Sequence, residues 1–390
     1  MNSFRIKSID ILRALTMLLM IFVNDLWTLT DIPGWLEHKA ANEDGMGLAD
    51  VVFPAFLFIV GLSIPFAIKS RLKKGDSTAQ ILWHIIERSA ALIIMGLFMV
   101  NLENVNDDKL AINNFVWEIL MAVGFVLVWN NYKGKTFGII PESVMKIAGL
   151  ALLVFLAVIY RGEIEKNGYE WMRLYWWGIL GLIGWGYLIS ALTYLILRDR
   201  PIWIAVVCLI FYLLNINEFA TPFNFHLRIV VSASNHASVL SGVLVTTILI
   251  RFQEKGRMKS LIPFLLGIAA LWILFGFLTR PEWGISKIRA TPSWTAICAG
   301  ITTISFVIIH IIADRLNFSK WAEIIAPAGK STLTCYLVPY IVYPIMALVS
   351  FHLPDVLTTG IVGLIKSLVF SLLIIWITGG LNRLGVNLKI

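Results

Sequence analysis

The chain has 390 residues, of which 58% are hydrophobic and only 14% are charged, and its formal net charge is +8. Soluble globular domains carry about 25% charged residues, so this composition excludes a water-soluble protein and requires lipid as the surrounding solvent. No long polar stretch interrupts the chain, which therefore predicts one all-α polytopic membrane domain over residues 1–390.

Twelve apolar segments are candidates for transmembrane helices, because a helix that crosses the hydrocarbon core needs about 20 consecutive apolar residues. The candidates are residues 9–28, 50–69, 80–102, 111–129, 140–160, 175–197, 201–217, 231–250, 260–279, 292–313, 330–350 and 359–380. The segment 201–217 is short, and the segment 140–160 begins irregularly around Pro141.

Lysine and arginine are distributed unequally over the loops that connect these segments. With the N-terminus in the cytoplasm and twelve spans, 18 loop cations lie inside and 9 lie outside. Cytoplasmic loops are typically enriched in lysine and arginine, so the pattern predicts that both termini are cytoplasmic. The excess positive charge is thus explained by topology, and nucleic-acid binding is not expected.

Several ionisable residues fall inside the apolar segments, where insertion costs about 2.5–3.5 kcal/mol each. Asp10 and Arg13 share one helix face, and Arg88 and Glu118 lie in the third and fourth segments. Lys366, in the last segment, is expected to extend its amine to the membrane interface. Together these residues predict a bundle with a polar interior.

The stretch from Ser8 to Arg71 carries a motif. It reads SIDILRALTMLLMIFVND, then a loop with WLEH, then GLADVVFPAFLFIVGLSIPFAIKSR. The pattern L-A-D-x-x-F-P-x-F-x-F-x-x-G, from Leu48 to Gly61, resembles the heparan-alpha-glucosaminide N-acetyltransferase family of transmembrane acyltransferases. The resemblance implies a bacterial-type member that transfers acetyl from cytoplasmic acetyl-CoA to the amine of an amino sugar or glycan on the outer face.

The resemblance also implies two functional residues, His38 as the catalytic histidine and Asn24 as an asparagine of the active site. An imidazole titrates near neutral pH and suits a general base toward the amine, or it can itself carry the acetyl group. Asn24 could donate a hydrogen bond to the developing oxyanion or orient His38. Asp50 has two open roles: fixing the tautomer of His38, or capping the second helix.

Basic residues near the cytoplasmic side are candidates for binding CoA, whose nucleotide end carries phosphates. Arg13 and Arg88 are expected to line a tunnel for the pantetheine arm or to pair with the phosphates. Lys69, Arg71 and Lys74 lie in a basic loop that could meet the nucleotide, although the positive-inside rule alone explains their charge. No metal-ligand spacing is present, and no metal is expected.

Two other functions fit the same features. An amino-sugar transporter would also have twelve helices and a polar interior, and an acyltransferase could act on a glycan hydroxyl instead of an amine. Residues 175–217 are expected to be an insertion relative to the family core. The expected location is a bacterial inner membrane; the oligomeric state stays open, with a homodimer as one option.

Overall fold

The computed structural model describes residues 6–132, 140–163, 169–219 and 230–390. Five of the loop cations counted above, Arg5, Lys133, Lys135, Lys166 and Arg228, lie outside these ranges. Within them, nearly the whole chain is helical, apart from loops and one short antiparallel hairpin of β1 (Gly162–Glu163) and β2 (Tyr169–Glu170). The predicted all-α architecture is therefore confirmed.

Helices occupy all twelve predicted segments. The α-helices are α1 (Lys7–Asp25), α2 (Leu48–Lys73), α3 (Thr78–Asn101), α4 (Asn114–Trp129), α5 (Glu142–Ile159), α6 (Gly178–Leu197), α7 (Pro201–Asn217), α8 (Ala233–Glu254), α9 (Met258–Trp283), α10 (Pro292–His310), α11 (Ala326–Lys330), α12 (Thr332–Leu337), α13 (Pro339–Leu348) and α14 (Gly360–Arg383). Short turns of other helix types follow α1 (Leu26–Thr28), α3 (Leu102–Asn104) and α10 (Ile311–Arg315), and two more occur at Lys320–Glu323 and Asp355–Leu357.

The predicted single helix over 330–350 is wrong in detail. The segment is broken into α12 and α13, with α11 ending just before it. Pro339 stands at the first position of α13, where its missing N–H is tolerated, whereas the same ring inside a continuous helix would clash with the preceding turn.

Eight helices in the described ranges are long and apolar enough to cross a membrane: Leu48–Lys73, Thr78–Asn104, Glu142–Ile159, Gly178–Leu197, Ala233–Glu254, Met258–Trp283, Pro292–Arg315 and Gly360–Arg383. Three shorter apolar helices, Asn114–Trp129, Pro201–Asn217 and Thr332–Leu348, accompany them. The fold is that of an integral membrane protein. The count of twelve spans and the cytoplasmic position of both termini stay predictions.

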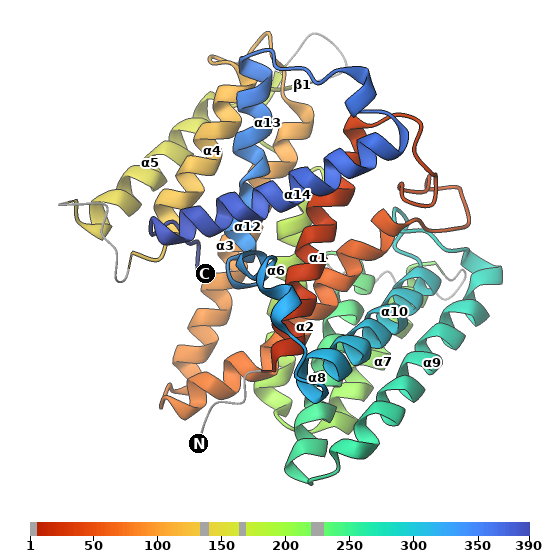
Figure 1. The fold of residues 1–390 in the computed structure, drawn as a ribbon. Coiled ribbons are helices and arrows are strands. Elements are labelled where there is room, and N and C mark those ends of the chain that lie inside the picture. Colours follow the sequence, from red (N-terminus) through yellow and green to blue (C-terminus); the bar gives the residue numbers. More distant parts are fainter. Residues whose placement is uncertain (1–5, 133–139, 164–168, 220–229) are drawn as a thin grey trace.

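Helices α1 and α2 lie at the centre of the bundle (Figure 1). α4, α5 and α13 pack together on one side of them, and α7, α9 and α10 lie on the other side around α8. The most hydrophobic stretch of α8 is completely buried by α2, α6, α7, α9 and α10. α8 is therefore surrounded by protein and has no face left for lipid.

The crossing of α2 and α8 depends on two glycines, Gly61 and Gly242. A methyl group added to Gly61 would lie 1.9 Å from the carbonyl oxygen of Val239, and one added to Gly242 would lie 1.9 Å from that of Phe58. Small residues let membrane helices approach closely enough for backbone contacts. The glycine that ends the LADxxFPxFxFxxG motif thus sets the distance between these two helices.

A buried ion pair joins the end of α1 to α14. The Lys366 Nζ lies 2.7 Å from Asp25 Oδ2, and the two side chains are 16% and 2% exposed. The hydroxyls of Ser367 and Tyr343 also donate to the Asp25 carboxylate. The expectation that Lys366 reaches the membrane interface is therefore wrong, because a buried carboxylate provides a partner for its charge inside the bundle.

Candidate active site

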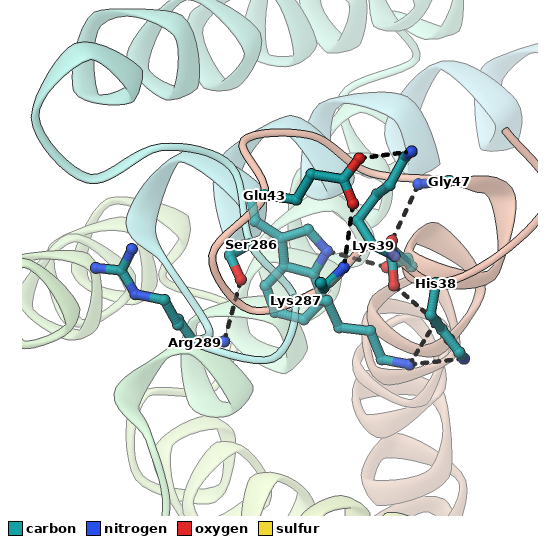
Figure 2. Close-up of polar contacts among 10 residues, drawn as sticks. His38, Lys39, Glu43, Gly47, Ser286, Lys287 and Arg289 are labelled. Atoms are coloured by element: carbon teal, nitrogen blue, oxygen red, sulfur yellow. Dashed lines mark hydrogen bonds and ion pairs between the residues drawn. The ribbon is translucent and has the colours of Figure 1, made fainter. Parts of the chain in front are cut away.

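His38 and Asp50 form a direct pair at the start of α2. The Nδ1 atom of His38 lies 2.7 Å from Asp50 Oδ1 (Figure 2). The carboxylate is 1% exposed, whereas the imidazole is 47% exposed. The buried acid thus holds one ring nitrogen, and the accessible side of the ring remains available to a substrate.

Asp50 also caps the helix on which it stands. Its second oxygen, Oδ2, accepts hydrogen bonds from the backbone N–H groups of Gly47 at 3.0 Å and Lys39 at 3.1 Å. Gly47 precedes the first turn of α2, so the bond from Asp50 is a helix cap. The two roles considered for Asp50, capping and contact with His38, are therefore combined in one carboxylate.

The loop that carries His38 is fixed at several points. The backbone N–H of Leu48 donates to the carbonyl of Trp35 at 2.8 Å. Asp44 accepts from the backbone N–H of Ile285 at 2.7 Å and pairs with Arg280. A methyl group on Gly47 would lie 1.9 Å from the carbonyl oxygen of Glu37. Only glycine therefore fits where the end of the loop passes the backbone of Glu37. These contacts tie the loop to the segment between α9 and α10.

Lys287, from the loop between α9 and α10, lies against the imidazole. Its Nζ is 3.2 Å from His38 Nδ1 and 3.3 Å from Nε2 (Figure 2). Partial burial lowers the pKa of Lys287 from its usual value, although the nearby Asp50 acts in the opposite direction. Lys287 therefore adds a cation to the contact between His38 and Asp50.

α10 supports the same cluster from behind. The indole N–H of Trp294 donates to the backbone carbonyl of Asp50 at 2.9 Å, and Trp294 is 3% exposed. The start of α2 is thereby held against α10, and the carboxylate of Asp50 keeps its position relative to Lys287.

Arg13 and Arg88 line one cavity of about 310 Å³ between α1, α2, α3 and α6. The Arg13 guanidinium donates to Ser63 Oγ at 2.6 Å, and Arg88 stacks on Tyr187 with its carbon 4.9 Å from the ring centre. The Nε atom of Arg88 is buried and makes no hydrogen bond to any residue the structure describes. Lys330 also reaches this cavity.

The donor set of this cavity matches a phosphorylated acyl carrier. Guanidinium groups bind phosphate oxygens through charge-assisted hydrogen bonds, and the buried Nε of Arg88 has donor capacity to spare. The remaining walls are largely apolar, with Met20, Phe56 and Leu92 among them, and suit a flexible pantetheine arm. Residues Arg13 and Arg88 therefore fit a CoA thioester.

The three other basic residues predicted to meet CoA are placed differently. Lys69 pairs with Asp199 at 2.9 Å and Glu254 at 3.4 Å, and Arg71 pairs with Asp76 at 2.7 Å. Lys74 is exposed at the end of α2. None of the three is among the residues that line the Arg13–Arg88 cavity.

Asn24 is exposed at the end of α1 and makes no hydrogen bond to His38 in the described structure. It lines a different cavity, of about 250 Å³, together with Glu118, Trp27 and tyrosines of α12 and α13. Met20 and Tyr336 line both this cavity and the Arg13–Arg88 cavity. The structure thus brings His38 together with Asp50, and Arg13 with Arg88, but it does not join Asn24 to the histidine.

A larger hollow lies elsewhere. About 1270 Å³ in volume, it opens between α7, α8 and α9, with apolar walls and Arg200, Arg251, Lys255 and Arg257 at its rim. None of the predicted site residues lines it.

Lys287 is the functional candidate that the sequence does not reveal. It lies 249 positions after His38, in a loop where a lysine is unremarkable. Only the folding of the α9–α10 loop onto the His38 loop brings them together, and no local spacing predicts that contact.

The sequence similarity to known proteins covers the stretch that holds the predicted site residues. Residues 5–105 match the family model of the heparan-alpha-glucosaminide N-acetyltransferase catalytic region. The heparan-alpha-glucosaminide N-acetyltransferases of Mus musculus and Homo sapiens are each 37% identical to this chain over 101 residues.

The matched stretch covers 25% of this chain and 14% of each relative. It includes all eight residues proposed from the sequence: Arg13, Asn24, His38, Asp50, Lys69, Arg71, Lys74 and Arg88. Residues 5–105 of the chain are therefore similar in sequence to the heparan-alpha-glucosaminide N-acetyltransferases, and this stretch contains the motif between Ser8 and Arg71.

Proposed function

We propose that the protein is a transmembrane acetyltransferase that uses acetyl-CoA to acetylate the amine of an amino sugar or glycan. One observation carries the proposal: the 2.7 Å pair of His38 and Asp50 lies inside the stretch that matches the catalytic family model. The donor would enter from the cytoplasm and the acceptor from the outer face, in a bacterial inner membrane.

The His38–Asp50 pair supports general-base chemistry. When Asp50 accepts a hydrogen bond from Nδ1–H, the lone pair of the neutral ring is on Nε2. The acceptor ammonium first loses one proton to solvent, and Nε2 then takes a second proton from the amine nitrogen as that nitrogen attacks the thioester carbonyl carbon. The new C–N bond forms, the C–S bond breaks, and the proton passes from His38 to the departing CoA thiolate.

The same geometry also supports a covalent route, in which Nε2 itself attacks the thioester and then passes the acetyl group to the amine. In that case acetyl-CoA alone would leave an acetyl group on His38. Mass spectrometry of the protein incubated with acetyl-CoA and no acceptor separates the two routes.

Arg13 and Arg88 are the residues we propose for holding the donor. Both line the same cavity, and guanidinium groups suit the phosphates of CoA. Lys69, Arg71 and Lys74 do not line this cavity, so we assign Lys69 and Arg71 a structural role through their ion pairs and leave Lys74 as a surface charge.

The decisive experiment compares His38→Ala with His352→Ala in the full-length purified protein. His352 is an exposed loop histidine remote from the cluster in sequence, so it controls for the loss of an imidazole alone. We expect His38→Ala to abolish acetyl transfer from acetyl-CoA to D-glucosamine while thermal stabilisation by CoA persists. Wild-type rates in His38→Ala would refute the assignment. Binding of sugars without any response to CoA would favour the transporter.

A further inference from the structure

The cavity beside Asn24 has a composition that the proposed chemistry at His38 does not use. It lies between α1, α4 and α13, and aromatic rings form much of its wall: Trp27, Tyr336, Tyr340 and Tyr343. Glu118, from α4, is the one acidic residue among the side chains that line it.

Glu118 makes no hydrogen bond or ion pair with any residue in the described ranges, although its side chain is partly buried. The nearby Asp25, by contrast, is already balanced by Lys366 at 2.7 Å. A carboxylate withdrawn from water is costly unless a cation or hydrogen-bond donors compensate it. The protein itself supplies no such partner at Glu118, so a ligand with a positive charge is the natural complement.

The aromatic side chains favour the same kind of ligand. Cations bind over the faces of tryptophan and tyrosine rings, because the electron-rich ring face attracts positive charge. Trp27 is 75% exposed, and an exposed indole beside a cavity is a suitable platform for the apolar face of a sugar ring. The cavity is also small, about 250 Å³, which fits one monosaccharide better than an extended chain.

The position of the cavity relative to the donor is equally favourable. Met20 and Tyr336 line both the Glu118 cavity and the Arg13–Arg88 cavity. A thioester held by the arginines and an amine held by the carboxylate would therefore lie on either side of a shared wall. His38 lines neither cavity, so this site would bind the acceptor before it reaches His38.

We propose that this cavity binds the acceptor through its protonated amine, with Glu118 as counter-ion, Asn24 at its edge and Trp27 beneath the sugar ring. The ligand class is a primary ammonium sugar, and its identification as the acceptor rests on the proposed acetyltransferase function. Glu118 is then the residue that selects an amine over a neutral sugar.

Calorimetric titration of the full chain in detergent tests the proposal, with D-glucosamine as the probe and N-acetylglucosamine as its uncharged counterpart. At pH 7, the wild type should bind D-glucosamine at least about 10-fold more tightly than N-acetylglucosamine. Glu118→Gln should remove this preference without changing the affinity for N-acetylglucosamine. Asp355→Asn, an exposed carboxylate before α14, is the matched control and should behave like the wild type.

Two further variants guard against a folding defect. Glu118→Asp should retain part of the preference, and Trp27→Leu, at an exposed position, should weaken binding of both sugars about equally. Thermal stabilisation by CoA should persist in every variant, which shows that the bundle is intact. Wild-type binding of D-glucosamine by Glu118→Gln, or no preference for the amine in the wild type, would overturn the proposal.

The experiment also separates this inference from the proposed function. His38→Ala should lose acetyl transfer and still bind D-glucosamine normally. If the wild type transferred no acetyl group, the proposed function would fail, and loss of D-glucosamine binding in Glu118→Gln would still establish the ammonium site.

Discussion

Replacing Asp50 with asparagine should separate its structural role from its chemical one. The side chain keeps its shape, and its carbonyl oxygen can still accept from the backbone N–H groups of Gly47 and Lys39, as Oδ2 does now at 3.0 and 3.1 Å. The new NH₂ group then faces His38 Nδ1, which lies 2.7 Å away in the wild type. Because two donors cannot bond to each other, Nδ1 must become the acceptor and the ring proton must move to Nε2.

The geometry sets the size of both effects. The two backbone bonds survive, and the bond to His38 reverses its direction and loses its charged acceptor. The free energy of unfolding should therefore fall by at most about 1–3 kcal/mol. Activity should fall much further, because a ring protonated on Nε2 cannot accept the proton of the amine. General-base catalysis contributes about 10²–10⁴-fold, so kcat should drop by that factor.

The assay is acetyl transfer from acetyl-CoA to D-glucosamine, measured alongside thermal unfolding. Asp44→Asn is the control, because Asp44 anchors the same loop to Ile285 and Arg280 without touching His38. It should keep kcat within a few-fold of the wild type. A folded Asp50→Asn protein with normal kcat would refute the tautomer argument, and an equal loss in Asp44→Asn would show that loop anchoring alone matters.

Three other perturbations have defined outcomes. Gly61→Ala should destabilise the bundle by at least about 1–3 kcal/mol by overpacking, seen as a lower Tm, whereas Gly267→Ala, with open space around it, should be neutral or slightly stabilising. Burial lowers the pKa of Lys287 from 10.5, so at a pH between the folded-state and unfolded-state pKa values the unfolded chain binds more protons than the folded chain. The free energy of unfolding should therefore rise with pH through that window. Lys287→Met should make this rise, measured in denaturant titrations, smaller. Arg88→Met should weaken CoA binding about 10-fold in calorimetry, and Lys74→Ala should leave it unchanged.

Much of the fold follows from hydropathy, because lipid demands long apolar helices and the chain supplies them in order. Breaks within a helix are harder to predict, because Pro339 starts a new helix inside a segment whose hydropathy is continuous. Lys366 shows the same limit. Its partner Asp25 lies 341 positions earlier, so the sequence suggests an interfacial lysine where the fold forms a buried ion pair.

In the candidate site, too, some contacts can be predicted from the sequence and others cannot. Asp50 and His38 are close in sequence, and the helix start between them makes their contact predictable. Arg13 and Arg88 also share a cavity, as their depth in the bundle suggests. Lys287 could not be foreseen, because its contact with His38 depends on how two loops fold together.

The complete enclosure of α8 has a consequence for how the protein is made. It is the least apolar of the eight long spans, and its most hydrophobic stretch is wholly buried. The hydrocarbon core of the membrane provides no hydrogen-bond partners for the serines and threonines of α8, or for its Asn235 and His236. Two of the helices that enclose it, α9 and α10, are synthesised later. Until they arrive, the polar side chains of α8 depend on the earlier helices α2, α6 and α7 for partners.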